Sequence, residues 1–197
     1  MRLKTLVLLC LLACLPLEIL AQAQPDGGER EQLRQFLERS IARASSFTDR
    51  YDAEVWLMDM SARMQPFVEE PARRLALLEA VHFHAREAAL PPELVLAVIE
   101  VESRFQRFAL SKSGAQGLMQ VMPFWRQEIG RPDDNLTDIH TNLSYGCRIL
   151  QFYLEQEQGQ LSTALARYNG SAGSQRYPDK VHAAWRRHWR LEPLNWR

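Results

Sequence analysis

Two neighbouring stretches carry most of the structural information in this chain: Ile99–Phe105 (IEVESRF) and Ser113–Pro123 (SGAQGLMQVMP). Placed on a helix at about 100° per residue, residues 92–105 present an apolar arc that includes Leu94 and Val98. The glycines of the second stretch can adopt positive φ and let the backbone pass close to another element. The pattern therefore predicts a helix followed by a glycine-rich turn.

The two glutamates of this helix fall on different faces. Glu100 lies opposite the apolar arc and can pair with Arg104 four residues later, so we interpret it as a solvated surface charge. Glu102 lies on the apolar arc in the last turn, where burial and the helix dipole both favour its protonated form. Such an acid suits glycosidic cleavage. Taken alone, the same position also fits a border glutamate that reaches water.

The first 23 residues have the pattern of a secretory signal. Two basic residues precede an apolar run from Leu6 to Leu17, and an Ala-x-Ala cleavage site ends at Ala23. The run is shorter than the roughly 20 apolar residues of a membrane span. A competing interpretation treats Leu11–Cys14 as a lipobox, with a lipid anchor on Cys14. Both predict an exported, periplasmic protein, either free or anchored as a lipoprotein.

Charge composition argues against nucleic acid as the partner. The chain has 24 Lys and Arg against 24 Asp and Glu, and phosphate binding needs a surplus of cations. The end of the chain is a local exception, with few acidic residues among Arg176, Lys180, Arg186, Arg187, Arg190 and Arg197. We interpret this segment as a solvated helix face, with contact to an anionic polymer as the alternative.

Cysteine and histidine give no sign of a disulfide or a metal site. Removal of the signal leaves Cys147 alone, on an apolar helix where core packing is expected. His82 and His84 are two residues apart and point to different faces of a helix, and the chain has no His-Glu-x-x-His pattern. We expect neither a metal nor a cofactor.

Apolar periodicity predicts an all-α protein, because no run alternates long enough for a strand. We expect a helical N-terminal extension or spacer over residues 24–68, one helical domain over 69–190 and a tail over 191–197. The expected helices cover residues 29–44, 52–64, 71–90, 92–105, 118–129, 139–156, 161–167 and 178–190.

Four linked motifs carry a resemblance to a known family. They are Glu102-Ser103-x-Phe105, then Ser113-Gly114-Ala115-x-Gly117-Leu118-Met119-Gln120-x-Met122-Pro123, then Asn142-Leu143-x-x-Gly146, and finally Ala164-Leu165-Ala166-x-Tyr168-Asn169. In order and spacing, over about residues 70 to 185, they resemble the motifs of the soluble lytic transglycosylase family. The resemblance implies a lysozyme-like (goose-type) helical domain that acts on peptidoglycan, and it implies nothing about residues 24–68.

The resemblance also implies a set of site residues. Glu102 matches the catalytic acid, and Ser103 matches a residue that positions substrate or acid. Met119 and Gln120 match residues of the glycan cleft. Tyr168 matches a tyrosine whose hydroxyl approaches the catalytic carboxylate, and Asn169 matches a substrate-contacting amide.

Three further short elements complete or depart from the family pattern. Tyr177 and Val181 match a further Tyr-x-x-x-Val element. Gln106-Arg107 replaces the usual Asn-Pro, which leaves the helix stop open. Gly170-Ser171 replaces Ala-Gly after Asn169, which leaves the loop geometry open.

The number of carboxylates points to a mechanism. Most glycosidases use two carboxylates across the scissile bond. Here only Glu102 is well placed, while Glu128, Asp133, Asp134 and Asp138 resemble helix-end or loop residues. One acid suffices if the substrate supplies the nucleophile. We therefore hypothesise that Glu102 acts as acid and then as base.

In this hypothesis the protein cleaves the β-1,4 bond between N-acetylmuramic acid and N-acetylglucosamine without water and leaves 1,6-anhydromuramoyl ends. Peptidoglycan glycan strands would be the partner, and a monomer is expected. The alternatives are a hydrolytic muramidase, an inactive peptidoglycan-binding envelope protein and an exported helical scaffold with no affinity for glycans.

Overall fold

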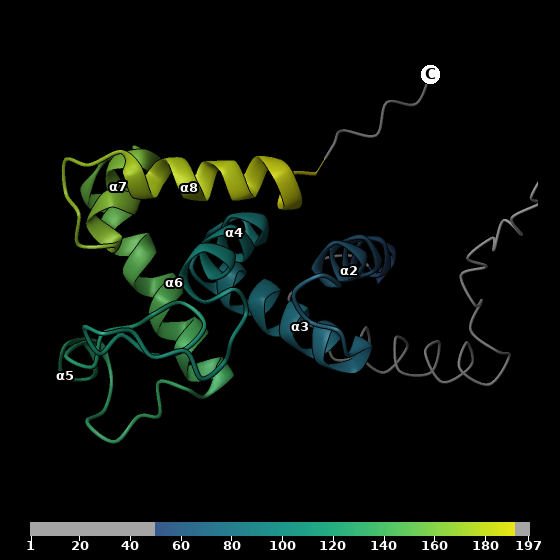
Figure 1. The fold of residues 1–197 in the computed structure, drawn as a ribbon, viewed down its shortest axis with the longest axis horizontal. Helices are drawn as coiled ribbons and strands as arrows, with labels where there is room; N and C mark the ends of the chain where they lie inside the picture. The colour runs from purple at the N-terminus through teal and green to yellow at the C-terminus, as the bar shows by residue number, and fades with distance from the viewer. Residues whose placement is uncertain (1–49, 192–197) are drawn as a thin grey trace, which may run out of the picture.

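Helices build the protein. In the computed structural model, which describes residues 50–191, the only β pairing is in two isolated bridges, so the all-α prediction is confirmed (Figure 1). The helices are α2 (Arg50–Met64), α3 (Pro71–Glu87), α4 (Pro92–Ser103), α5 (Trp125–Ile129), α6 (Ile139–Gln156), α7 (Leu161–Tyr168) and α8 (Arg176–Ala184), followed directly by the π-helix η1 (Trp185–Trp189). The signal, the proposed anchor at Cys14, the expected helix over 29–44 and most of the tail lie outside the described residues.

Helix α4 is the centre of the fold. It begins at Pro92, where proline suits the first helical position, and all side chains of residues 94–99 are at most 2% exposed. Helices α3 and α8 and the π-helix η1 pack around it, while α6 packs against α3 and α7. This environment buries most of α4 and leaves its last turn, with Glu102, at the edge of the core.

The chain leaves α4 through two left-handed residues. Arg104 has φ 50° and Phe105 has φ 63°, and the Phe105 side chain turns back into the core with 2% exposure. The helix therefore ends at Ser103, although Gln106-Arg107 stands where the family usually has Asn-Pro.

The surroundings of Glu100 differ from those that the sequence predicted. Its carboxylate accepts hydrogen bonds from Trp189 Nε1 at 2.7 Å and pairs with His188 Nδ1 at 2.9 Å, and its side chain is 14% exposed. The prediction of a solvated charge paired with Arg104 was wrong. The cause is that η1, about ninety residues later in the chain, covers the face of α4 that periodicity assigned to solvent.

The expected helix over residues 118–129 is also mostly absent. Only Trp125–Ile129 is helical, because Pro123 interrupts the segment and Gln120 has φ 49°. Instead, Gln116 forms antiparallel bridges with Leu110 and with Val121. The chain folds into a compact turn that lies against α6.

Residues 50–68 belong to the same hydrophobic core as the later helices. Helix α2 buries Trp56, Leu57 and Met60 and packs against α3 and η1. Arg63 Nη1 donates to the carbonyls of His188 at 3.1 Å and Arg190 at 3.2 Å. This part of the expected extension is therefore not a spacer. Within residues 50–191, the helices are all too short or too polar to span a membrane.

Candidate active site

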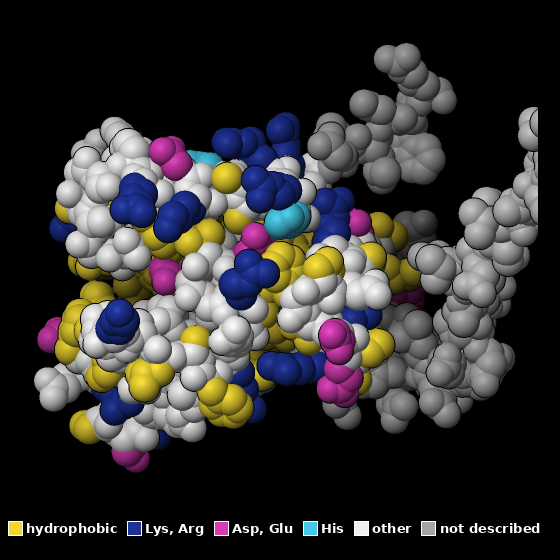
Figure 2. Space-filling model, in the orientation of Figure 1, with side chains coloured by type: hydrophobic (Ala, Val, Ile, Leu, Met, Phe, Trp, Pro, Cys, Tyr) yellow, Lys and Arg dark blue, Asp and Glu magenta, His cyan; other side chains and the backbone are white. Residues whose placement is uncertain are grey.

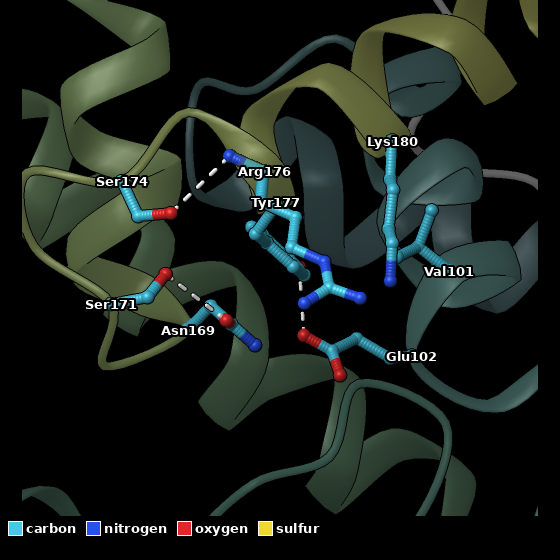
Figure 3. A pocket seen from close by; sticks show the side chains of 8 residues that line it. All are labelled: Val101, Glu102, Asn169, Ser171, Ser174, Arg176, Tyr177 and Lys180. Carbon is cyan, nitrogen blue, oxygen red and sulfur yellow. Dashed lines mark hydrogen bonds between the residues drawn. The ribbon is translucent and has the colours of Figure 1, made fainter.

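A pocket of about 320 Å³ opens where the last turn of α4 meets the start of α8. Figure 3 shows that its walls come from three places: Val101 and Glu102 from α4; Asn169, Ser171 and Ser174 from the loop after α7; and Arg176, Tyr177 and Lys180 from α8. Glu102 is the one carboxylate among these lining residues. Sequence periodicity placed Glu102 at the apolar edge of its helix, and the structure shows that this edge borders a pocket.

Glu102 is held by one strong hydrogen bond. The hydroxyl of Tyr177 donates to Glu102 Oε1 at 2.7 Å (Figure 3). Burial raises the pKa of Glu102 from 4.5 to about 7, against the smaller lowering effects of the Tyr177 hydrogen bond and the Lys180 charge. A carboxyl group with a pKa near neutrality can give a proton and take one back at the same pH. Its Oε2 atom receives no hydrogen bond from residues 50–191.

The tyrosine that donates a hydrogen bond to Glu102 is Tyr177. The family resemblance named Tyr168, which lies close enough for the Glu102 charge to raise its pKa but does not bond to the carboxyl group. The Tyr168 hydroxyl donates instead to the main-chain oxygen of Met119 at 2.7 Å. Burial raises the pKa of both phenols well above the ordinary value, so both remain protonated donors. The Tyr-x-x-x-Val element was the sequence signal for Tyr177.

Met119 is a packing residue and does not line the pocket. Its side chain is 0% exposed and lies against Gly146, where an added Cβ would come within 2.7 Å of Met119 Cβ. Its main-chain N–H donates to Asn142 Oδ1 at 2.8 Å, and its carbonyl receives the Tyr168 hydroxyl. In this structure the side chain therefore has a packing role, and the absence of a Cβ at Gly146 makes room for it. Contact of Met119 with a glycan stays a prediction.

Asn142 and Ser103 hold the glycine-rich turn in place. The buried amide of Asn142 also donates to the carbonyls of Gln116 at 2.9 Å and Leu136 at 2.8 Å. The Ser103 hydroxyl contacts the carbonyl of Leu118 at 2.8 Å, which joins the end of α4 to the turn. Ser103 is buried and does not line the pocket, so its contacts position the turn beside Glu102.

Gln120 and Asn169 differ in their relation to the pocket. The Gln120 amide donates to the carbonyls of Gly117 at 2.9 Å and Ala109 at 3.3 Å, and its side chain does not line this pocket. Asn169 lines the pocket directly, and its Oδ1 accepts from Ser171 Oγ at 3.2 Å. Contact of either residue with substrate stays a prediction.

Cys147 occupies the core, as the sequence suggested. It is 1% exposed, and burial raises the pKa of its thiol to about 12, which keeps it protonated and unreactive. Over residues 50–191, no three His, Cys, Asp or Glu side chains gather in a way that could hold a metal ion.

Comparisons with known proteins agree with this geometry. The family model described as "Transglycosylase SLT domain" matches residues 79–186, which is more than half of the chain and includes every residue that lines the pocket. A protein named "Transglycosylase" from Enterobacteria phage PRD1 is 34% identical over 99 residues, which make up 47% of this chain and 36% of the phage protein. The chain thus spans about a third of the length of that relative. The match of the family model to the residues that build the pocket shows that this chain belongs to the SLT-domain transglycosylase family.

Proposed function

We propose that this protein is a peptidoglycan lytic transglycosylase that cleaves the β-1,4 bond between N-acetylmuramic acid and N-acetylglucosamine. The observation that carries the proposal is a single carboxyl group, Glu102, in a pocket lined by no second carboxylate, with a pKa raised to about 7. Most hydrolytic glycosidases use a second carboxylate as nucleophile or as base for water. A reaction in which the substrate supplies its own nucleophile needs only one.

In the first step, Glu102 is the general acid. Its free Oε2 gives a proton to the glycosidic oxygen, the bond from that oxygen to the muramoyl C1 breaks, and the N-acetylglucosamine side leaves as an alcohol. Positive charge develops at C1. The new carboxylate keeps the Tyr177 hydrogen bond on Oε1 and lies near the Lys180 charge, both of which favour its charged form.

In the second step, Glu102 is the general base. Its carboxylate takes the proton from the muramoyl 6-hydroxyl as O6 bonds to C1, which closes a 1,6-anhydro ring and restores the acid for the next turnover. No water is consumed. The nucleophile belongs to the same sugar as the electrophile, so the reaction has the proximity advantage of an intramolecular attack.

The proposal places the reaction outside the cytoplasm, where peptidoglycan lies. The signal pattern of residues 1–23 supports export, and a lipid on Cys14 is the alternative to cleavage after Ala23. N-terminal sequencing of the mature protein, together with labelling of wild type and Cys14→Ala by a fatty-acid probe, distinguishes a free periplasmic protein from a lipoprotein.

Digestion of murein sacculi in ¹⁸O-labelled water tests the chemistry. A lytic transglycosylase releases muropeptides with anhydro ends and no ¹⁸O, and Glu102→Gln releases none. Reducing ends that carry ¹⁸O would instead establish a muramidase. Binding to sacculi without soluble product from the wild type would establish an inactive binding protein, and the absence of binding would leave only a scaffold.

A further inference from the structure

Two cations line the pocket without a salt bridge. Arg176 and Lys180 are four residues apart on α8, and Figure 3 shows both side chains directed toward the Glu102 side of the pocket. Both are exposed, and neither forms a salt bridge with a carboxylate of residues 50–191, Glu102 included. Like charges at this helical spacing repel and lower helix stability. A contribution to fold stability therefore does not explain why Arg176 and Lys180 lie side by side.

The rest of the pocket does not offset this charge. The neighbouring wall consists of Asn169, Ser171 and Ser174, which are neutral, and the one acidic residue, Glu102, is uncharged when it is ready to donate its proton. Figure 2 shows that dark-blue Lys and Arg side chains also gather on the surface over α8 and η1. The pocket is thus electropositive when Glu102 is protonated, and it favours a ligand with a negative charge.

We propose that Arg176 and Lys180 form a carboxylate-binding subsite for the acidic substituent of the muramoyl sugar, an inference that rests on the proposed function. N-acetylglucosamine is neutral, whereas the muramoyl sugar bears a lactyl group that ends either in a free carboxylate or in a peptide with carboxylates of its own. A guanidinium and an ammonium group together can donate charge-assisted hydrogen bonds to either anion. The subsite selects muramoyl-containing strands and fixes which sugar stands on the α8 side of Glu102.

Substrates that differ only in charge provide the test. Glycan strands with peptides, and strands stripped of peptides by an amidase so that the lactyl carboxylate is free, are each compared with the same material after its carboxylates are converted to amides. The variant is Arg176→Gln/Lys180→Gln. The control is Arg186→Gln/Arg187→Gln, which removes two positive charges from η1, outside the pocket.

The readout is the ratio of kcat/KM on the charged substrate to kcat/KM on its amidated form. We expect the wild type and the control to prefer charged strands by about tenfold, and the pocket variant to bring the ratio close to one. Added salt weakens the preference of the wild type. The ratio cancels any effect of Lys180 on the Glu102 pKa, because both substrates meet the same enzyme. A preference seen only on stripped strands assigns the anion to the lactyl group, and one seen only with peptides assigns it to the peptide.

An equal loss on charged and amidated strands would overturn the subsite. Equilibrium binding of the same four substrates to Glu102→Gln, with and without the two pocket substitutions, keeps this test separate from catalysis. Loss of the charge preference in binding supports the subsite even if the product analysis shows hydrolysis. An unchanged preference rejects the subsite even if anhydro ends confirm the transglycosylase.

Discussion

The hydroxyl of Tyr177 on α8 lies 2.7 Å from Oε1 of Glu102 at the end of α4, while the hydroxyl of Tyr168 on α7 lies 2.7 Å from the carbonyl of Met119. Both tyrosine hydroxyls therefore donate a hydrogen bond of the same length, but to different partners. Tyr177 donates to the carboxyl group that lines the pocket, whereas Tyr168 donates to a backbone carbonyl.

Substitution of the two tyrosines should separate these roles. Tyr177→Phe removes a hydrogen bond that lowers the Glu102 pKa, so the alkaline limb of the pH–kcat/KM profile should move to higher pH. kcat should fall about tenfold, because the Glu102 carboxylate that forms when the glycosidic oxygen takes its proton no longer has the Tyr177 hydroxyl as a donor. Tyr168→Phe should leave the limb in place and lower the free energy of unfolding by about 1–2 kcal/mol. An unchanged limb in Tyr177→Phe would contradict the assignment.

The pH dependence of the wild type follows from the protonation of Glu102. In the proposed mechanism the acid form starts the reaction, and a pKa of about 7 means that this form is lost above neutrality. kcat/KM should thus be constant below the pKa as far as this group is concerned and fall about tenfold per pH unit well above it. Initial rates of release from sacculi between pH 5 and pH 9 measure the limb. A limb centred near the ordinary pKa of a glutamate would show that the acid is not a buried one.

Glu102→Gln should stabilise the fold as it abolishes activity. The folded-state pKa is raised above the unfolded value of 4.5, so the folded protein binds more protons between pH 4.5 and about 7 and its stability falls as pH rises through that range. The neutral amide removes this loss, and the gain at pH 8 is on the order of 3 kcal/mol. Urea unfolding at pH 8 and at pH 4 measures it. The difference between variant and wild type should be large at pH 8 and nearly disappear at pH 4.

Asn142→Ala should be among the most damaging substitutions outside the pocket. The side chain is 1% exposed and binds the backbone of Met119, Gln116 and Leu136. Truncation leaves the buried Met119 N–H and Leu136 carbonyl without a partner, while the Gln116 carbonyl keeps the Val121 N–H. The expected loss is about 3 kcal/mol or more. Asn135→Ala is the matched control, because its hydrogen bonds to Thr137 are exposed and their loss should cost about 1 kcal/mol or less. Equal losses in the two variants would contradict the buried network.

Glu100 and Arg104 test the structure against the sequence interpretation. Glu100→Ala leaves the indole N–H of Trp189 without an acceptor and removes the pairing with His188, so we expect a loss of about 2–3 kcal/mol. Arg104→Ala removes an exposed side chain whose guanidinium lies 5.7 Å from the Phe67 ring centre, and the loss should be below about 1 kcal/mol. Urea unfolding of both variants gives the comparison. A surface pair between Glu100 and Arg104 would make the two losses similar.

Local sequence signals recovered the helical class, the position of Glu102 at the border of an apolar face and the glycine-rich turn. They failed where a distant segment determines the environment. Glu100 looked solvated because nothing near it in sequence shows that η1 covers it. Tyr177 is 75 residues from Glu102, and motif spacing could not tell which of two tyrosines reaches the acid. The family resemblance placed Met119 in the cleft, and nothing near it in sequence shows that its side chain packs against Gly146.

The packing of α2 determines where the boundaries of this domain must lie in a chimeric protein. The span that the family model matches, residues 79–186, leaves out all of α2, the first half of α3 and the end of η1. Leu57, Met60 and Trp189, each 0% exposed, lie outside that span, as does Arg63, which ties α2 to the carbonyls of His188 and Arg190. A fragment limited to the residues of the family match would keep the pocket but expose the core surface that α2 and the end of η1 cover. The span of the family match is thus smaller than the hydrophobic core, and a chimera should carry at least residues 50–191.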